Sequence, residues 1–180
     1  MKKVFVLGST GSIGINCLNV ISNLRNDFEV TGLTVNSNTE LLLEQIKIFK
    51  PKVIAVRDES AAKKMSGKIP KGCELLIGEE GLIKAALETD YDIFMGAMVG
   101  FAGLAPTLEA IKRGKRIALA NKETLVVAGE IVTKLVLENS AEIIPVDSEH
   151  SAIYQCLVGE NLEEVEKLIL TASGGPFRDK

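Results

Sequence analysis

Two carboxylates and a histidine stand close together in the run Asp147-Ser148-Glu149-His150, directly after an apolar stretch at residues 142–146. Asp147 and Glu149 are two residues apart, so in an extended turn both carboxylates can face one ion, and hard oxygen ligands suit Mg²⁺ or Mn²⁺. Helix capping is the alternative, with Asp147 or Ser148 as the cap and Glu149 in the first turn, and the spacing alone favours it. His150 is the only histidine, and a lone histidine is more often structural than catalytic.

A lysine occupies a second position suited to chemistry, in Asn121-Lys122-Glu123 after the apolar run at residues 116–119. The alternative is ordinary helix initiation, with Asn121 as the cap and Glu123 in the first turn. A lysine at a helix N-terminus opposes the helix dipole, however, and such a local conflict is typical of functional sites. Lys122 could bind an anionic substrate or polarise a carbonyl.

A glycine-rich motif lies near the end of the chain, where residues 173–178 read S-G-G-P-F-R. A Ser-Gly-Gly turn can present hydroxyl and N–H donors to a phosphate. An ordinary loop is the alternative, and it is the commoner case.

Three glycines recur at every third position in residues 8–14, which read G-S-T-G-S-I-G. An apolar run at residues 4–7 precedes them and a helical pattern follows. Such a loop can bring its backbone close to a pyrophosphate, because glycine has no Cβ, and the helix N-terminus adds free N–H groups. A tight structural turn is the alternative. The position after the first strand of an alternating chain favours dinucleotide binding.

The end of the second predicted strand bears on which dinucleotide binds. The segment Asn36-Ser37-Asn38 contains no acid. An Asp or Glu there would hydrogen-bond the ribose hydroxyls of NAD and repel a 2′-phosphate, whereas Asn and Ser can donate hydrogen bonds to that phosphate. The segment therefore favours NADP, although it offers no Arg or Lys to pair with the phosphate.

Short apolar runs alternate with helical patterns along most of the chain. The predicted strands are residues 4–7, 28–35, 53–56, 74–77, 92–95, 116–119 and 142–146. The predicted helices include residues 12–24, 39–49, 122–138 and 148–158. Residues 165–171 suggest one more strand. One apolar face of the first helix contains Ile13, Cys17, Val20, Ile21 and Leu24.

This alternation predicts an α/β fold, a Rossmann-type doubly wound and mostly parallel sheet with helices on both faces. Strands in such a sheet are buried on both sides, which explains their near-continuous apolar character. The pattern weakens after residue 146. We therefore expect a dinucleotide-binding Rossmann domain at residues 1–146 and the incomplete start of an α+β domain at residues 147–180, which is too short for a core of its own.

Composition excludes several classes of protein. The 180 residues carry a formal net charge of −3 without a strong basic run, so nucleic-acid binding is not expected. The chain lacks an apolar stretch of about 18 residues and a signal peptide, which predicts a cytoplasmic protein with no membrane partner. Cys17, Cys73 and Cys156 lie far apart, which favours small buried side chains in a reducing compartment over zinc or disulfides.

Four of these motifs together resemble one family. The runs at residues 8–14, 121–123, 147–153 and 173–178 occur in this order in 1-deoxy-D-xylulose 5-phosphate reductoisomerase. The resemblance covers essentially the whole chain, and its last two motifs, D-S-E-H-S-A-I and S-G-G-P-F-R, are specific to that family. It implies an enzyme of the non-mevalonate isoprenoid pathway, which rearranges 1-deoxy-D-xylulose 5-phosphate and reduces the intermediate with NADPH to 2-C-methyl-D-erythritol 4-phosphate.

The resemblance implies how the cofactor is held. The NADPH phosphates would lie against Thr10, Gly11, Ser12 and Ile13. The adenosine side would meet Asn36, Ser37 and Asn38, and the other cofactor contacts would be Asn121 and Glu123. Family members often carry a lysine where this chain has Ser37, which weakens the expected preference for NADPH over NADH.

The resemblance also implies a metal and a substrate site. Asp147 and Glu149 would hold Mg²⁺ or Mn²⁺, and His150 would support them. The phosphorylated sugar would bind Lys122, Ser148, Glu149 and Ser173, with Lys122 and Glu149 taking catalytic roles. A divalent ion that chelates substrate oxygens can act as a Lewis acid.

Family enzymes continue well beyond Arg178, with a third metal-binding carboxylate, a loop over the substrate and a helical domain. We therefore expect this chain to be a fragment, inactive alone, of an enzyme that forms a homodimer. Another NADP-dependent Rossmann dehydrogenase, or a nucleotide-sensing Rossmann module, remains an alternative. Either would explain the glycine loop but not the two specific motifs.

Overall fold

A seven-stranded sheet forms the centre of the computed structural model, which describes residues 1–171. Its strands lie in the order β4-β3-β2-β1-β5-β6-β7, and every neighbouring pair is parallel. They are β1 (Lys2–Leu7), β2 (Phe28–Val35), β3 (Val53–Val56), β4 (Glu74–Ile77), β5 (Ile93–Gly96), β6 (Arg116–Leu119) and β7 (Glu142–Pro145). The strand order reverses direction at β1, and a doubly wound sheet binds ligands beyond the carboxyl ends of the strands at such a point.

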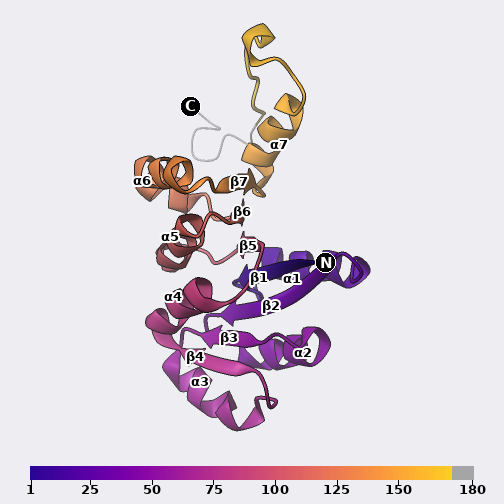
Figure 1. Cartoon of the computed structure of the whole chain (residues 1–180), viewed down its shortest axis with the longest axis vertical. Helices are drawn as coiled ribbons and strands as arrows, with labels where there is room; N and C mark the ends of the chain where they lie inside the picture. The colour runs from indigo at the N-terminus through magenta and orange to yellow at the C-terminus, as the bar shows by residue number, and fades with distance from the viewer. Residues whose placement is uncertain (172–180) are drawn as a thin grey trace, which may run out of the picture.

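Helices cover both faces of the sheet (Figure 1), with α1 and α2 on one side and α4, α5 and α6 on the other. The helices are α1 (Ser12–Asn23), α2 (Thr39–Phe49), α3 (Glu59–Met65), α4 (Gly78–Glu88), α5 (Leu104–Lys112), α6 (Glu123–Asn139) and α7 (Ser148–Leu157), with short 3₁₀ turns η1 (Ser66–Lys68), η2 (Phe101–Gly103) and η3 (Leu162–Glu164). The predicted doubly wound α/β fold is confirmed. Among residues 1–171, no helix combines the length and apolar character needed to cross a bilayer.

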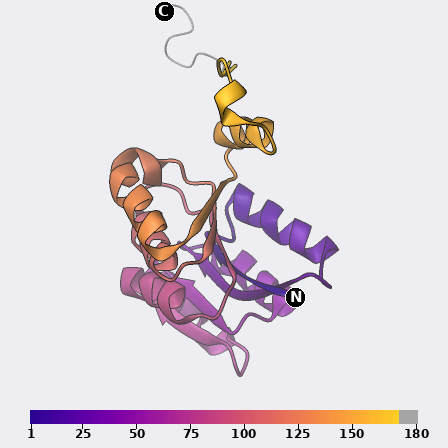
Figure 2. The same ribbon diagram turned by 45° about the horizontal axis from the view of Figure 1, so that its top comes forward.

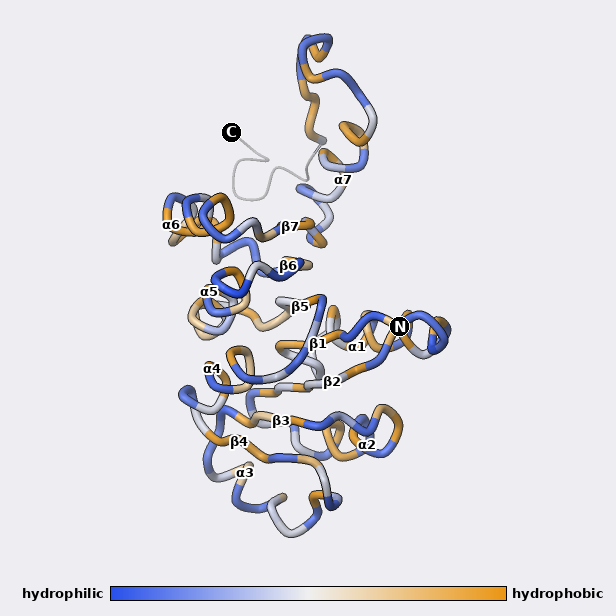
Figure 3. Tube along the Cα trace, viewed as in Figure 1, coloured by the Kyte–Doolittle hydropathy of each residue, from blue (hydrophilic) through white to orange (hydrophobic). Residues whose placement is uncertain are grey.

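The strands lie where the apolar runs predict them. Four of them, β2, β3, β4 and β6, occupy the predicted residues, and the other three differ by one or two residues at an end. Side chains of β1 alternate between two cores: Val4 and Val6 pack with α1 and α2, whereas Phe5 and Leu7 pack with α4 and α5. Hydrophobic stretches are visible along β1, β3 and β4 (Figure 3). Burial on both faces therefore explains the continuous apolar runs.

The apolar face predicted for α1 is only partly buried. Ile13, Val20 and Leu24 are 37%, 56% and 42% exposed. The buried residues of the helix are Gly14, Leu18 and Ile21. Of the apolar residues that the sequence places on one face, Ile21 is buried and these three are exposed, because the helix packs through Gly14, which apolar periodicity does not include.

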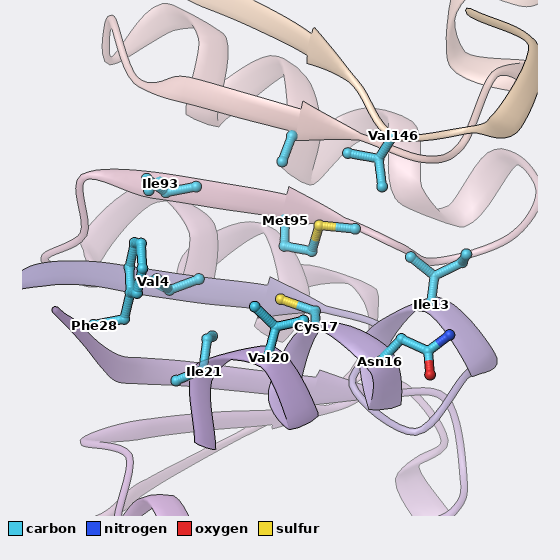
Figure 4. Close-up of a pocket in the computed structure, with 11 residues that line it drawn as sticks. Val4, Ile13, Asn16, Cys17, Val20, Ile21, Phe28, Ile93, Met95 and Val146 are labelled. Atoms are coloured by element: carbon cyan, nitrogen blue, oxygen red, sulfur yellow. The ribbon is translucent and has the colours of Figure 1, made fainter. Parts of the chain in front are cut away.

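An apolar groove of about 430 Å³ lies between α1 and the sheet. Ile13, Cys17 and Val20 line it from the helix, and Ile93 and Met95 line it from β5 (Figure 4). Helices α4, α5 and α6 lie on the opposite face of the sheet (Figure 1). The exposed side chains of α1 therefore complete an apolar surface that extends onto the central strands.

Residues 146–171, which follow β7, leave the sheet (Figure 2). No residue of α7 is buried, and the predicted strand at residues 165–171 does not form. Leu168, Ile169 and Leu170 are instead 55%, 79% and 53% exposed. A strand needs a partner for its backbone hydrogen bonds, and no strand of the described chain lies beside this segment. The strand prediction was therefore wrong, although the segment has the expected composition.

The three cysteines are free thiols in different environments. Cys17 and Cys73 are half-buried, and Cys156 is exposed on α7. Burial raises the pKa of the Cys17 thiol to about 11 and also raises the pKa of Cys73. The expectation of buried cysteines was wrong for Cys156, because α7 packs against little of the described chain.

We expect iodoacetamide at pH 8 to alkylate Cys156 first and Cys17 last. With a pKa of about 11, only about one thousandth of Cys17 is thiolate at that pH, and the thiolate is the reactive form. Mass spectrometry of peptides from a timed reaction measures the order. The urea-unfolded chain is the control, in which all three thiols should react at similar rates. Faster alkylation of Cys17 than of Cys156 in the native chain would contradict the packing of α1.

Candidate functional site

The glycine loop joins β1 to α1 at the carboxyl edge of the sheet. Gly8 has a φ of +89°, a left-handed conformation that favours glycine. Its N–H donates to the carbonyl oxygen and to Oγ1 of Thr34, both at 3.1 Å, and the N–H of Ser9 donates to the same carbonyl at 2.8 Å. No side chain caps α1, and its first turn contains no acid. The helix N-terminus is therefore available to an anion.

Two glycines allow close backbone packing around this loop. A Cβ on Gly14 would lie 2.2 Å from the carbonyl oxygen of Gly8 and 2.7 Å from Cα of Ser9. A Cβ on Gly8 would lie 2.8 Å from the N atom of Met98, in the segment after β5. Only glycine fits at either position. The loop therefore packs on the start of α1 and on the segment after β5, where the strand order reverses.

A buried pair of hydrogen bonds holds the loop from α2. Oγ of Ser9 donates to Oε1 of Gln45 at 2.7 Å, and Nε2 of Gln45 donates to the carbonyl oxygen of Ser9 at 2.9 Å. The two residues are 0% and 6% exposed. Buried polar side chains need partners, and each of these satisfies the other. Gln45 is not evident as a functional residue in the sequence, where its only signal is a polar side chain beside Leu42 and Ile46, which are buried in α2.

Asn121 follows β6 and holds the segment after β5. Its Nδ2 donates to the carbonyl oxygens of Met98 and Gly100, at 2.6 and 2.8 Å. The alternative of a helix cap is therefore wrong, because α6 has Lys122 at its N-cap and no side-chain hydrogen bond there. Among residues 1–171, Oδ1 of Asn121 and Oγ1 of Thr124 are buried and have no hydrogen-bond partner. Buried polar atoms without a partner in the protein could form hydrogen bonds with a ligand, in which the amide oxygen would accept and the hydroxyl could accept or donate.

Lys122 and Glu149 meet although they come from two different motifs. Nζ of Lys122 lies 3.5 Å from Oε2 of Glu149, and both side chains are nearly half exposed. Oγ of Ser148 donates to the same carboxylate at 3.0 Å. The backbone N–H of Glu149, the Ser148 hydroxyl and the Lys122 charge hold the pKa of Glu149 below its ordinary value. The carboxyl ends of neighbouring parallel strands thus bring the two predicted motifs together.

Asp147 has an extended backbone and caps α7, which begins at Ser148 and contains Glu149 in its first turn. Its Oδ1 accepts from the backbone N–H of His150 at 3.0 Å, and its Oδ2 lies 2.8 Å from Nδ1 of the same histidine. Partial burial opposes ionisation, but the His150 hydrogen bonds and the Lys122 charge still hold the pKa of Asp147 below its ordinary value. Capping is therefore observed at Asp147, and Ser148 and Glu149 are helical rather than extended, whereas metal binding by the two carboxylates stays a prediction.

The other predicted site residues fall into three groups. At the glycine loop, Thr10 is half-buried, whereas Gly11, Ser12 and Ile13 are exposed. Of the second segment, Asn36 and Ser37 are exposed, and Asn38 caps α2 by accepting from the N–H of Leu41 at 3.2 Å. Glu123 is exposed in the first turn of α6. Ser173 and the rest of the motif at residues 173–178 lie outside the described residues.

The described residues offer limited means of holding a metal. Within residues 1–171, no group of three or more His, Cys, Asp or Glu side chains is placed to hold an ion. Asp147 and Glu149 supply two carboxylates, and each is already engaged by a neighbour. Carboxylate oxygens are the type of ligand that Mg²⁺ prefers, but two carboxylates do not fill the octahedral oxygen shell that the ion requires.

The parallel sheet, the reversal of strand order at β1 and the uncapped helix after the glycine loop define a protein of the Rossmann class, a fold in which ligands bind beyond the carboxyl ends of the strands. Residues 4–129 match the family model described as 1-deoxy-D-xylulose 5-phosphate reductoisomerase, and residues 143–180 match the model of that enzyme's C-terminal domain. The chain belongs to this family.

Individual relatives agree with this assignment. The reductoisomerase of Caldanaerobacter subterraneus subsp. tengcongensis is 57% identical over all 180 residues, which are 47% of its length. A solved reductoisomerase from Zymomonas mobilis in complex with NADPH is 40% identical with a TM-score of 0.89, over 99% of this chain and 47% of that one. A second structure, with NADPH, fosmidomycin and magnesium, is 38% identical with a TM-score of 0.88, over 100% of this chain and 47% of that one. The chain thus spans about half the length of these relatives.

We expect Gly14→Ala to destabilise the chain by about 1–3 kcal/mol, because the new methyl group overlaps backbone atoms that cannot move freely. Binding of a dinucleotide should fall at least about tenfold, since the loop that would meet the pyrophosphate has to shift. Urea unfolding and a fluorescence titration with NADPH measure the two effects.

Gly129→Ala is the matched control. Among the described residues no atom lies within 4 Å of the added Cβ, and the residue lies in α6 directly after Ala128, where the helix is kinked. The added methyl group overlaps nothing there, so this substitution should not destabilise the chain and should leave dinucleotide binding unchanged. Equal behaviour of the two variants would show that the contact at Gly14 is not tight.

Proposed function

We propose that this chain is the cofactor-binding part and the start of the catalytic part of a 1-deoxy-D-xylulose 5-phosphate reductoisomerase. The enzyme would rearrange 1-deoxy-D-xylulose 5-phosphate to an aldehyde intermediate. It would then reduce this intermediate with NADPH to 2-C-methyl-D-erythritol 4-phosphate. One observation supports this most directly: the Lys122–Glu149 pair lies beyond the carboxyl ends of β6 and β7, on the same edge of the sheet as the glycine loop. A cationic and an anionic group at that edge suit a phosphorylated substrate beside a dinucleotide.

NADPH would supply the hydride for the reduction. The N–H groups at the start of α1 and the residues Thr10, Gly11, Ser12 and Ile13 would hold its phosphates. The adenosine side would lie at Asn36, Ser37 and Asn38, and Asn121 and Glu123 would make further contacts. Support comes from the uncapped helix, from Oδ1 of Asn121, which has no hydrogen-bond partner within the described residues, and from the NADPH bound in the Zymomonas mobilis relative.

Asp147 and Glu149 would bind Mg²⁺ or Mn²⁺, as the magnesium in a related structure suggests. The ion would supply Lewis acidity toward substrate oxygens. The pKa values of both carboxyls lie below their ordinary values, so both are ionised near neutral pH, as metal ligands must be. His150 would keep Asp147 oriented through its ring nitrogen.

The substrate would lie beside this ion. Lys122 would then be free of Glu149 and could bind an anionic or carbonyl oxygen of the substrate. Ser148, Glu149 and Ser173 would complete the contacts with the phosphorylated sugar.

Residues 1–146 would form the NADPH-binding domain and residues 147–180 the beginning of the catalytic, metal-binding domain. The sheet ends at Pro145, and no residue of α7 is buried, which supports a boundary there. A homodimer is proposed for the whole enzyme. The three free thiols suit a reducing cytoplasm.

We expect saturable binding of one NADPH per chain, followed by nicotinamide fluorescence. Asn36→Asp should shift the preference toward NADH, because a carboxylate at that position repels the 2′-phosphate and can hydrogen-bond the ribose hydroxyls. Circular dichroism controls for folding. A folded wild-type chain without saturable NADPH binding would overturn the proposed cofactor site.

A polypeptide of these 180 residues should bind Mg²⁺ weakly and show no measurable turnover. Asp147 and Glu149 offer only two carboxylates in the described part, and a missing ligand or its support costs about 10- to 100-fold in affinity or activity. Calorimetry with Mg²⁺ and NADPH oxidation with 1-deoxy-D-xylulose 5-phosphate and Mn²⁺ test this. Turnover abolished by Asp147→Ala would contradict the prediction, whereas turnover unchanged by that substitution would come from a contaminating enzyme.

A further inference from the structure

The adenosine 2′-phosphate distinguishes NADPH from NADH, and its charge calls for a cation. Enzymes of this class commonly meet that phosphate with an arginine near the end of the second strand. The segment Asn36-Ser37-Asn38 follows β2 and contains neither arginine nor lysine. A cation for the 2′-phosphate therefore has to come from another part of the chain.

Arg57 lies beside this segment at the carboxyl end of the next strand. Val35 of β2 is in register with Val56 of β3. The backbone hydrogen bonds between β2 and β3 continue past the ends of both strands. The N–H of Arg57 donates to the carbonyl oxygen of Val35 at 3.0 Å, and the N–H of Asp58 donates to the carbonyl oxygen of Asn36 at 2.9 Å. Asn36 and Arg57 are thus neighbours at the edge where the cofactor would bind.

The two residues line one cavity of about 300 Å³. Its other lining residues are Asp58, Glu59, Gly78 and Glu79. Three of these are acids, and a phosphate would be repelled if their charges were unmatched. The partners of these acids therefore decide whether an anion can enter.

Each acid has a partner in the structure. Oδ1 of Asp58 caps α3 by accepting from the N–H of Ala61 at 2.7 Å. Glu59 lies 3.6 Å from Nζ of Lys63. Glu79, at the start of α4, accepts from Nε and Nη2 of Arg57 through its Oε1, at 3.1 and 2.5 Å.

Glu79 leaves part of the guanidinium available. An arginine has five N–H donors in a planar fork, and only Nε and Nη2 of Arg57 are engaged among the contacts of the described residues. The side chain is 39% exposed, so a ligand can reach it. Glu79 would orient the guanidinium and at the same time weaken its attraction for a second anion.

We propose that Arg57 binds the 2′-phosphate of NADPH together with Asn36, and so determines the preference for NADPH in this chain. Arg57 thereby supplies the positive charge for the 2′-phosphate that the segment at residues 36–38 lacks. The inference rests on the proposed dinucleotide site. Glu79 sets the strength of the preference by competing for Arg57.

The test compares NADPH and NADH binding to single variants. Arg57→Met should weaken NADPH binding by about 10- to 100-fold, the usual range for losing a charged hydrogen bond, and leave NADH binding unchanged. Glu79→Gln should strengthen NADPH binding several-fold, because the competing charge is gone. Arg57→Lys should recover part of the NADPH affinity. Calorimetry with adenosine 2′,5′-bisphosphate and with ADP repeats the comparison without nicotinamide.

Lys63→Met is the matched control. It removes one positive charge from the ion pair of another lining acid, and its side chain is 73% exposed. It should leave the ratio of the two affinities unchanged. If Lys63→Met changed the ratio of NADPH to NADH affinity as much as Arg57→Met does, the effect would come from the loss of any nearby positive charge. That result would overturn the proposal.

Three further results would also overturn the proposal. Equal losses of NADPH and NADH binding in Arg57→Met would make the Arg57–Glu79 pair a structural element only. Unchanged binding of both dinucleotides would exclude Arg57 from the site. If the wild-type chain binds neither dinucleotide, the proposed function itself fails. Binding of NADH alone would retain a dinucleotide site and refute the role of Arg57.

Discussion

The rest of the site depends on the close contact between Gly14 and the carbonyl oxygen of Gly8. A Cβ on Gly14 would lie 2.2 Å from that oxygen, so only the glycine side of α1 can approach the loop, and this fixes the rotation of the helix about its axis. The same rotation buries Leu18 and leaves Ile13 and Val20 outside the core. Gly8 in turn packs on the segment after β5, which Asn121 holds from the end of β6. One backbone contact thus orders three elements around the switch point.

The fold could be predicted largely from local composition. Apolar residues dominate the strands of this sheet, so β2, β3, β4 and β6 were found at their observed residues, even though β2 contains Thr31 and Thr34 and β4 is only partly buried. The buried face of α1 was predicted only in part, because the helix is oriented by a residue without a side chain. The strand expected at residues 165–171 has strand-like residues, but sheet formation depends on a neighbour and not on composition alone.

The candidate site was predictable where strand ends carry polar residues. Lys122 and Glu149 each follow a strand, and parallel strands place such residues at one edge. The local geometry of Asp147 could not be predicted, because helix capping and metal binding use the same residue types at the same spacing. Gln45 and Arg57 were missed because their importance comes from residues 36 and 21 positions away in the sequence, which only the packing of α2 and the register of β3 reveal.

The reciprocal bonds between Ser9 and Gln45 have a consequence for the thermodynamics of ligand binding. A glycine-rich loop has a high conformational entropy when it is free, and a ligand that had to order it would lose part of its binding free energy. Here the backbone carbonyl and the side chain of Ser9 are both fixed from α2 before any ligand arrives. The entropy of ordering the loop is therefore lost during folding, so the loop meets its ligand already preorganised.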